Sequence, residues 1–351
     1  MQISLILLIL CSSGVLTYIG IELFRRQSLK RQWLDIPNQR SSHDRPTPRG
    51  AGIVVVPVCL LGYLLTVGLT GIHFSWGYFF GALVVASVSW LDDLYSLAIG
   101  WRLSAHILAA LLIIYSEGAW NVISFGNGAS FSLAWAAPFV TILWIVWVIN
   151  AYNFMDGIDG IAGVQGLAAS AAWAAICAEG ANGTYLFALI IFSTVAAFVF
   201  HNWQPAKVFI GDVGSAFLGF TYAAMPLLAS KEMPLKADLF PLASILILWP
   251  FVFDTLLTLV RRLMRRELIW LAHREHLYQR LVIAGFSHPR VAVIYGVFAA
   301  VTSSTALLLV QGSGNFILVI VGFVIVISAF FTFIVSKKFS SCTSLDTPHG
   351  A

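Results

Sequence analysis

The sequence predicts an all-α polytopic membrane protein with about 11 transmembrane helices. Three observations support this fold class. The 351 residues are 59% hydrophobic and only 10% charged, whereas a soluble globular chain carries about 25% charged residues. Apolar runs of about 20 residues, the length that crosses roughly 30 Å of hydrocarbon, recur from one end of the sequence to the other. The basic residues are concentrated in alternate loops between these runs.

The apolar runs place the predicted spans along the chain. The first run begins at Ile3, with no basic residue before it and no cleavage pattern, so we expect a retained span and not a signal peptide. The predicted spans cover residues 3–24, 51–70, 75–91, 103–116, 133–150, 161–178, 184–200, 215–230, 239–259, 291–310 and 316–335. A single transmembrane domain is therefore expected over residues 1–338, followed by a short disordered tail at 339–351.

The loop charges predict how the chain is oriented. Eighteen of the twenty lysines and arginines fall on one set of alternate loops, and only Lys231 and Lys236 fall on the other. Because basic loops are retained in the cytoplasm, the N-terminus is expected outside and the C-terminus inside. The working face is then the cytoplasmic one. The net charge of +4 gives no indication of a nucleic-acid partner.

Acidic residues gather in four segments at the cytoplasmic ends of predicted spans. These segments hold Asp92 and Asp93, Asp156 and Asp159 between Asn153 and Gly160, Asp212 between Gly211 and Ser215, and Asp254. A carboxylate at membrane depth costs about 2.5–3.5 kcal/mol on insertion scales, so a single acid at the end of a span usually reaches the interface. The shared side of all four segments favours a common active-site cleft instead.

The spacing of these acids predicts a divalent cation. Asp92 and Asp93 are adjacent, so their side chains point about 100° apart on a helix, and like charges so close need a cation or a raised pKa. Asp156 and Asp159 are three residues apart and are expected to share a helix face. Oxygen ligands without a cysteine or histidine cage favour Mg²⁺, with Mn²⁺ as a substitute.

Two basic loops lie on the same predicted side. The loop 261–290 contains His273, Arg274 and His276. The two histidines would share a helical face and contact anionic phosphates or a sugar, with Arg274 supplying fixed charge. The alternative is a basic amphipathic segment that only lies against lipid headgroups.

The second basic loop, 35–52, is too rich in proline for one regular helix. It contains Arg40 and His43 as candidate substrate contacts, and its alternative interpretation is a solvated connector. Glycines also recur at every third position from Gly157 to Gly166. They either allow close helix packing or let backbone N–H groups approach a phosphate.

Acids that hold Mg²⁺ beside basic loops that hold anions are the parts needed for phosphoryl transfer, and their place at a membrane face suggests a lipid reactant. At these residues the sequence resembles the polyprenyl-phosphate N-acetylhexosamine-1-phosphate transferase superfamily, glycosyltransferase family 4. The resemblance covers nearly the whole chain and looks closest to the branch that initiates O-antigen and related envelope polysaccharides. The matching motifs are Asp35–His43, Asp92–Asp93, Asn153–Gly160, Asn202–Ser215 and His273–His276.

The resemblance implies transfer of N-acetylhexosamine 1-phosphate from a UDP-N-acetylhexosamine to undecaprenyl phosphate, with release of UMP. It also implies that Asp212 is a direct Mg²⁺ ligand, that Asp92 and Asp93 act at the phosphate and metal centre, and that Asn202 supports substrate binding. The resemblance and the residue patterns together give the full set of candidate site residues. The catalytic candidates are Asp92, Asp93, His273 and His276; the metal ligands are Asp212 and Asp93; the substrate-binding candidates are Asn153, Asp156, Asp159, Asn202, Arg102, Arg40, His43 and Arg274.

Two positions depart from the family pattern. Glu275 precedes His276 where the family often has adjacent histidines. The peptidoglycan branch has lysines soon after its paired aspartates, but here Arg102 is the nearest cation. Membrane lipid is an expected partner, and a homodimer is compatible with the sequence.

The sequence is less consistent with two other function classes. An ion-coupled transporter would use acids near the middle of the membrane and a path open to both faces. A CDP-alcohol phosphotransferase would need an arginine in its aspartate-glycine signature, and the segment Asp159–Gly163 has none.

Overall fold

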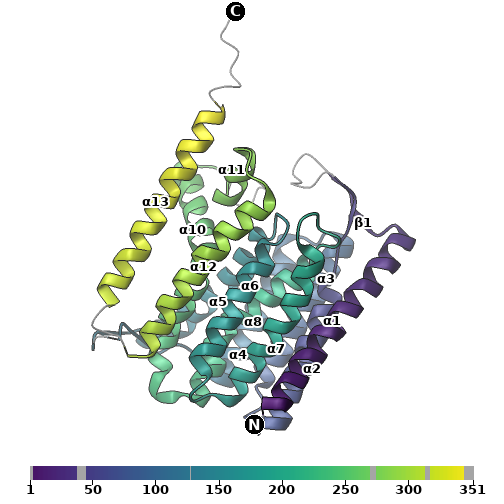
Figure 1. The fold of residues 1–351 in the computed structure, drawn as a ribbon. Coiled ribbons are helices and arrows are strands. Elements are labelled where there is room, and N and C mark those ends of the chain that lie inside the picture. The colour runs from purple at the N-terminus through teal and green to yellow at the C-terminus, as the bar shows by residue number, and fades with distance from the viewer. Residues whose placement is uncertain (1–2, 38–44, 127, 269–273, 313–316, 344–351) are drawn as a thin grey trace, which may run out of the picture.

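The chain forms a bundle of α-helices with two short β-hairpins (Figure 1). The computed structural model describes residues 3–37, 45–126, 128–268, 274–312 and 317–343. In this part of the chain, nine helices are long and apolar enough to cross a membrane, or ten if a bent pair is counted as one span. The fold is therefore that of a predominantly helical multi-pass membrane protein, as the composition predicts.

The first four helices match predicted spans. They are α1 (Ile3–Arg31), α2 (Gly52–Thr70), α3 (Trp76–Tyr95) and α4 (Ile99–Glu117). The prediction ended the first span at residue 24, but α1 continues as helix to Arg31, because its last turns carry no proline or glycine that would end it. Only 17% of the most apolar window of α1 is buried, so this helix lies at the edge of the bundle.

The next four helices contain the centre of the bundle. They are α5 (Ala137–Met155), α6 (Ile161–Cys177), α7 (Asn182–Asn202) and α8 (Gly211–Glu232). In α8, 94% of the most apolar window is buried, and this helix packs against α2, α3 and α5. The N-terminus of α8 is therefore enclosed by several other elements, and it is here that the acidic segments converge.

The predicted span 239–259 is wrong as a continuous helix. The chain forms α9 (Phe240–Ile247) and α10 (Trp249–Met264), which meet at a bend of 69°. Pro250 lies in the first turn of α10. A proline there has no N–H for the preceding turn, and its ring clashes with the carbonyl four residues earlier, so one straight helix cannot pass through this position.

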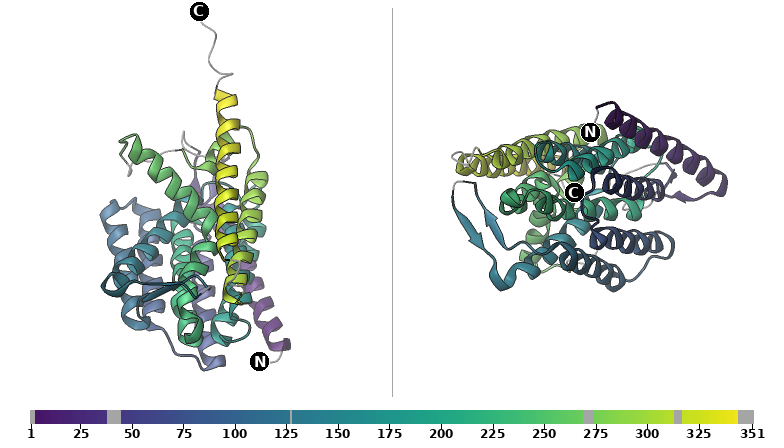
Figure 2. Two further views of the ribbon diagram at one scale, coloured as in Figure 1. Left: turned by 90° about the vertical axis from the view of Figure 1, so that its left-hand side faces the viewer. Right: turned by 90° about the horizontal axis from the view of Figure 1, so that it is seen from below.

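The last helices are α11 (Leu277–Ile283), α12 (His288–Val310) and α13 (Ile317–Thr343). α13 packs against α11 and α12 at the edge of the bundle. Figures 1 and 2 show that α1 begins at one end of the bundle and α13 finishes at the other. The end at which α13 finishes also carries α11 and β1.

Among the residues that the structure describes, two small hairpins and two 3₁₀ turns complete the fold. β1 (Leu34–Asp35) pairs antiparallel with β2 (Thr47–Pro48), in agreement with a proline-rich segment that is not one helix. β3 (Val122–Ser124) pairs with β4 (Ser130–Ser132), which the sequence did not lead us to expect. Figure 2 shows this second hairpin projecting from the side of the bundle. The 3₁₀ turns are η1 (Ala134–Ala136) and η2 (Pro234–Leu239).

Candidate active site at the N-terminus of α8

Three carboxylates surround one guanidinium group at the N-terminus of α8. Nη2 of Arg49 lies 3.2 Å from Oδ1 of Asp93 and also contacts Asp212. Nη1 of the same arginine lies 3.8 Å from Oδ2 of Asp35. Burial alone would lower the pKa of Arg49, but the neighbouring carboxylates raise it above its usual range. Arg49 is thus a permanent positive charge among acids that would otherwise repel one another.

Asp93 joins α3 to the first turn of α8. Its carboxylate accepts hydrogen bonds from the backbone N–H groups of Asp212 (3.2 Å) and Val213 (3.1 Å). The first N–H groups of a helix have no partner within the helix, and the helix dipole favours a negative charge there. Asp93 therefore satisfies two of these donors and holds its own carboxylate beside that of Asp212.

The backbone around Arg49 is held against the segment that leads into α8. Phe209 donates its N–H to the carbonyl of Pro48 (2.8 Å), and Gly52 donates to the carbonyl of Ile210 (2.8 Å). Gly211 has φ +75°, and a Cβ atom at this position would lie 2.9 Å from Oδ2 of Asp93. Only glycine suits both the left-handed backbone and this close approach.

Asp92 has different partners from Asp93, as expected for adjacent residues on a helix. Its carboxylate accepts a hydrogen bond from Nη1 of Arg102 (2.8 Å) and another from the N–H of Leu97 (2.7 Å). Its side chain is only 7% exposed. Arg102, a candidate substrate contact, is thus paired with Asp92 across the turn between α3 and α4.

The expectation that Asp156 and Asp159 share a helix face is wrong. α5 ends at Met155 and α6 begins at Ile161, so both acids lie in the turn between the two helices. Gly160 has φ +81°, a left-handed conformation that a helix cannot contain. The pKa of Asp156 is raised well above its usual range, first by burial and then by nearby carboxylates, against the lowering effect of Arg49.

Asn202 and Asp159 bind this turn to the segment after α7. The side chain of Asn202 accepts the N–H of Gly160 (2.8 Å) and donates to the carbonyl of Val208 (3.0 Å). Asp159 accepts the N–H of Ala206 (3.1 Å) and lies 3.5 Å from Nδ1 of His288. These contacts fix one wall of a polar cavity of about 520 Å³. Its lining includes Arg45, Asp159, Gln204, Phe209, Ser287 and His288.

Close packing accounts for two of the four glycines in the repeat. A Cβ atom at Gly163 would lie 2.3 Å from Val199, and one at Gly157 would lie 2.1 Å from the hydroxyl of Tyr278. These contacts favour the packing interpretation over a phosphate contact at both positions. Nearby, Asn153 in α5 accepts a hydrogen bond from the Ser215 hydroxyl in α8 (3.1 Å), so this candidate lies one turn along α8 from the carboxylate cluster.

The expectation of a shared helical face for the two histidines is wrong at His276. α11 begins only at Leu277, so His276 precedes the helix. Arg274 lies in the same non-helical stretch. Three further predicted site residues lie outside the described part of the chain: Arg40, His43 and His273.

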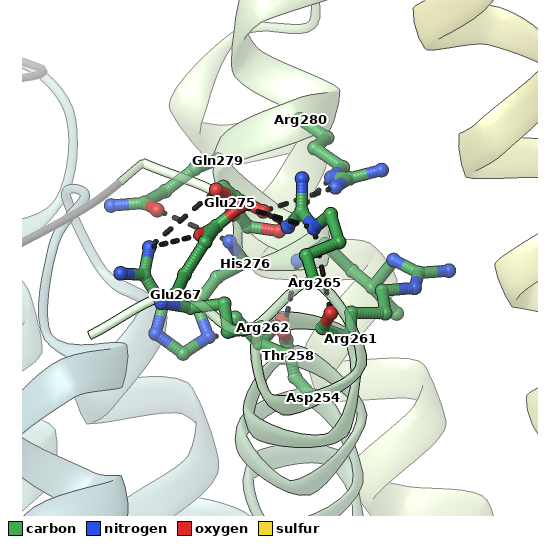
Figure 3. Close-up of polar contacts among 11 residues, drawn as sticks. Asp254, Thr258, Arg261, Arg262, Arg265, Glu267, Glu275, His276, Gln279 and Arg280 are labelled. Atoms are coloured by element: carbon green, nitrogen blue, oxygen red, sulfur yellow. Dashed lines mark hydrogen bonds and ion pairs between the residues drawn. The ribbon is translucent and has the colours of Figure 1, made fainter. Parts of the chain in front are cut away.

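Glu275 is surrounded by arginines where the family often has a histidine (Figure 3). Its carboxylate contacts Arg265 directly, lies 3.5 Å from Nη1 of Arg262 and lies 3.6 Å from Nη2 of Arg280. Burial alone would raise the pKa of Glu275, but the hydrogen bond from Arg265 and the charges of all three arginines lower it overall. The acid therefore serves as the counter-charge of a basic cluster.

Two cavities have a largely apolar lining. One, of about 200 Å³, lies between α5 and α10, where Trp147, Phe154 and Leu259 face it and Arg262 and His276 supply polar groups. A second, of about 580 Å³, contains Arg49 and Asp93. Its apolar lining includes Phe24, Trp33, Leu34, Ile53, Trp90 and Leu94. The charged centre is therefore accessible to a molecule that is partly apolar.

Two residues of this region were missing from the predicted site. Arg49 occurs in the basic loop singled out from the sequence, but its three carboxylate partners are 14 to 163 residues away in the chain. Asp254 was noted as an acid in a predicted span, and it is fully buried under His276. The sequence does contain a signal for both residues. Each is a charged residue beside an apolar span, on the predicted side that carries the other acids.

Within the ranges that the structure describes, no group of three or more histidine, cysteine, aspartate or glutamate side chains is arranged to hold a metal ion. Asp93 and Asp212 supply carboxylate oxygens from two helices at one place. Mg²⁺ in enzymes commonly keeps several waters and takes one or two protein carboxylates together with substrate phosphates. A pair of acids is thus compatible with Mg²⁺ and too few for a closed metal site.

Comparison with known proteins gives a consistent result. The family model described as glycosyl transferase family 4 matches residues 75–230. The chain is 28% identical over 330 residues to a probable undecaprenyl-phosphate N-acetylglucosaminyl 1-phosphate transferase of Bacillus subtilis. The matched residues make up 91% of this chain and 90% of the relative.

Two further relatives differ in how much they cover. A decaprenyl-phosphate N-acetylglucosaminephosphotransferase of Mycobacterium leprae is 25% identical over 311 residues, 81% of this chain and 78% of that protein. A phospho-N-acetylmuramoyl-pentapeptide-transferase of Latilactobacillus sakei is 27% identical over 128 residues, 35% of this chain and 36% of the relative. The two transferases of N-acetylglucosamine phosphate therefore match over most of the chain, and the pentapeptide transferase over about a third.

Proposed function

Because the chain belongs to glycosyl transferase family 4 and to its polyprenyl-phosphate hexosamine-1-phosphate transferases, we propose that it transfers an N-acetylhexosamine 1-phosphate from a UDP-sugar to undecaprenyl phosphate. The products are a polyprenyl-diphosphate sugar and UMP. The names of the relatives favour N-acetylglucosamine as the sugar. The polymer begun on this lipid is proposed to be an O-antigen or a related cell-envelope polysaccharide, as the sequence motifs imply.

The meeting of Asp93, Asp212 and Arg49 at the N-terminus of α8 is the observation that carries the proposal. Both reactants are anions, so a transferase must compensate negative charge where they meet. A fixed guanidinium and a pair of carboxylates suited to a divalent cation supply that compensation. An apolar cavity that contains Arg49 and Asp93 brings the same centre within reach of a lipid.

In the proposed reaction an oxygen of the lipid phosphate attacks the β-phosphorus of the nucleotide sugar. The bond between that phosphorus and the bridging oxygen breaks, and UMP leaves with the electron pair. A phosphate monoester has a second pKa near 6, so the attacking group is largely ionised at pH 7 and needs little help from a base. A single direct displacement is therefore proposed, without an aspartyl intermediate.

Asp212 and Asp93 are the residues proposed to hold Mg²⁺. A bound Mg²⁺ would neutralise the phosphates and polarise the scissile diphosphate. The carboxylate of Asp93 would hold the ion in a fixed orientation, because two N–H groups of α8 fix this carboxylate in place. Asp92, paired with Arg102, is proposed to act at the same centre from the turn between α3 and α4.

The polar cavity beside Asp159 is the proposed site for the nucleotide sugar. Its size, about 520 Å³, suits a nucleoside or sugar, and Arg45, Gln204 and Phe209 offer charge, hydrogen bonds and an aromatic face. Asn202 shapes this cavity by holding Gly160 and Val208. Asn153, Asp156, His276 and Arg274 are proposed as further substrate contacts, and Arg40, His43 and His273 stay predictions.

The membrane arrangement is part of the proposal. We propose eleven crossings on the basis of the apolar runs. The eighteen-to-two distribution of basic residues supports an external N-terminus, an internal C-terminus and a cytoplasmic active site. The family resemblance implies that the membrane is a bacterial inner membrane. The bent pair α9–α10 and the 17-residue α6 would each have to count as one crossing. A homodimer likewise stays a prediction.

An ion-coupled transporter has less support. The relatives are transferases of sugar phosphates, and the acids gather where helices end: Asp93 near the end of α3, Asp212 at the start of α8 and Asp156 just after α5. A transporter would be expected to place such acids near the middle of the membrane, on a path open to both sides.

The test is an activity measurement on purified protein. Undecaprenyl phosphate and Mg²⁺ are supplied with each of several UDP-N-acetylhexosamines, and UMP release is measured. We expect release with at least one sugar, dependent on the lipid phosphate and reduced at least about a hundredfold in the Asp212→Asn protein. Failure of every UDP-sugar to release UMP from protein shown to be folded would contradict the proposed function.

A further inference from the structure

We infer that Asp254 is a positioning residue that fixes His276 and the start of α11 at the active site. This inference rests on the proposed function, because it assigns His276 a part in the transfer reaction. Asp254 lies in α10, four residues before Thr258, and its side chain is fully buried. Such an acid is costly unless its oxygens are satisfied by several donors.

Asp254 is contacted by five groups at once. Oδ1 accepts hydrogen bonds from the N–H of Leu277 (2.8 Å) and the hydroxyl of Thr258 (3.3 Å). Oδ2 accepts from the N–H of Tyr278 (3.2 Å) and the hydroxyl of Tyr295 (2.5 Å). The fifth group is Nδ1 of His276, 3.2 Å from Oδ1. Both oxygens are thus saturated by groups from three helices and the segment before α11.

The contacts with Leu277 and Tyr278 explain how a short helix keeps its place. α11 has only seven residues, which is too few to be stable by itself in water. Its first N–H groups have no partners within the helix. The carboxylate of Asp254 accepts two of them from α10, and the side chain of Gln279 accepts the N–H of His276 (3.3 Å). The start of α11 is thus held both from α10 and by a cap within the segment itself.

The same carboxylate determines how His276 is turned. An ionised carboxylate only accepts hydrogen bonds, so the Nδ1 atom that faces it carries the proton. His276 is 5% exposed, and its ring stacks on that of Tyr278 with an angle of 18° between the planes. Figure 3 shows Asp254 beneath His276, at the junction of α10 with the residues that precede α11.

His276 also lines the apolar cavity between α5 and α10, beside Arg262. A histidine whose one ring nitrogen is held by a buried acid has a fixed tautomer and a fixed ring orientation. This is the arrangement in which a third group orients a catalytic histidine. Asp254 is therefore proposed to act through His276, since its hydrogen bonds go to Thr258, His276, Leu277, Tyr278 and Tyr295.

A buried acid that only stabilises the fold would show some of the same contacts, so the first test measures coupling. UMP release is compared for the wild type, Asp254→Asn, His276→Ala and the double variant. We expect each single variant to lose at least tenfold in kcat/KM, and the double variant to lie within about threefold of His276→Ala, because residues that act as a unit are not additive. Losses that multiply, or a fully active Asp254→Asn, would overturn the inference.

The second test needs no activity. Hydrogen exchange of the Leu277 and Tyr278 amides is compared between the wild type and Asp254→Asn, and about tenfold faster exchange is expected in the variant. The matched control is Tyr78→Phe, which removes a buried hydrogen bond to Thr221 between α3 and α8. It should lower the melting temperature without changing exchange in α11. Unchanged exchange in Asp254→Asn would contradict the inference.

Two outcomes of these tests require a further measurement or a different interpretation. If Asp254→Asn does not accumulate as folded protein, both measurements are made on Asp254→Glu, which keeps the charge but moves it by one methylene group. If the wild type itself releases no UMP, the proposed function fails, and the exchange measurement alone decides whether Asp254 holds this segment in place.

Discussion

The guanidinium of Arg49 forms an ion pair with the carboxylate of Asp212, which lies 163 residues later in the sequence. The pair depends on backbone contacts between the segment before α2 and the segment before α8, where Pro48, Phe209 and Ile210 are joined by hydrogen bonds. Because Asp93 contacts the same guanidinium, Arg49 compensates two of the acids expected to bind Mg²⁺. An anionic substrate that enters this centre meets a cation already in place.

Arg49→Ala is therefore expected to reduce kcat/KM for UMP release at least about a hundredfold, because three carboxylates lose their common partner. Arg49→Lys should lie between this variant and the wild type, since an ammonium keeps the charge but cannot contact two acids through a planar fork. Arg26→Ala is the matched control, because that side chain is 67% exposed on α1. Normal turnover by Arg49→Ala would show that the acids tolerate one another without it.

Asn202 should be needed mainly for the shape of the nucleotide cavity. Asn202→Asp can still accept from Gly160, but it no longer donates to the carbonyl of Val208, and a buried group left unpaired costs about 1–3 kcal/mol. We expect a lower melting temperature and a higher KM for the UDP-sugar. Asn182→Asp, exposed at the other end of α7, should change neither. An unaltered KM in a folded Asn202→Asp protein would remove the residue from this role.

Part of the site could be predicted because it depends on local sequence. Apolar runs locate the helices, and acids at their ends locate one face of the bundle. The spacing of Asp92 and Asp93 also predicted their different directions, which the structure confirms through Arg102 and the N–H groups of α8. These inferences require only the geometry of a single helix.

The remaining features depend on contacts between distant segments. The spacing of Asp156 and Asp159 suggested a helix, but the left-handed Gly160 keeps both acids in a turn. The five contacts of Asp254 come from residues 4 to 41 positions away, and no periodicity reveals them. The bend before α10 did have a local signal in Pro250, which hydropathy alone does not weigh.

Glu275 predicts a response to acid. Its pKa is lowered in the folded protein, so the stabilisation that it gives is complete above its ordinary value of 4.5 and is lost as the pH falls through the folded pKa. In the wild type, the protection of residues 274–283 from hydrogen exchange should therefore decrease when the pH is lowered below about 4.5. Glu275→Gln should be poorly protected at neutral pH, with no further change on acidification.

The same surroundings predict that Glu275→His is harmful. The family often has a histidine at this position, but here a histidine would face Arg262, Arg265 and Arg280. A neutral or protonated imidazole cannot replace the counter-charge. We expect less protection in α11 and lower activity than in the wild type. A variant with normal turnover would show that the arginines find another anion.

The orientation can be tested with single cysteines in a variant that lacks the four native ones. Lys207→Cys lies in the exposed segment between α7 and α8, and Asp238→Cys lies in η2. In intact cells an impermeant thiol reagent should label position 238 and leave position 207 unlabelled until the membrane is opened. Ready labelling of position 207 from outside would contradict both the topology and the cytoplasmic active site.

Asp212→Asn is expected to raise the activation barrier by at least about 2.7 kcal/mol, roughly a hundredfold in rate. An amide cannot neutralise a divalent cation, so the variant should also need more Mg²⁺ for the activity that remains. Asp93→Asn should be comparably damaging, because it removes charge at the same place and weakens the bonds to the N–H groups of Asp212 and Val213. Asp238→Asn, on the exposed η2, is the matched control.

Removal of the metal gives the complementary measurement. UMP release should stop in EDTA and return with Mg²⁺ or Mn²⁺, whereas Zn²⁺ should restore it poorly for want of nitrogen or sulfur ligands. The Mg²⁺ concentration for half-maximal activity should rise in Asp212→Asn and stay unchanged in Asp238→Asn. If the wild type keeps full turnover in EDTA, Arg49 is the main source of positive charge at this centre, and the two carboxylates serve to hold that arginine in place.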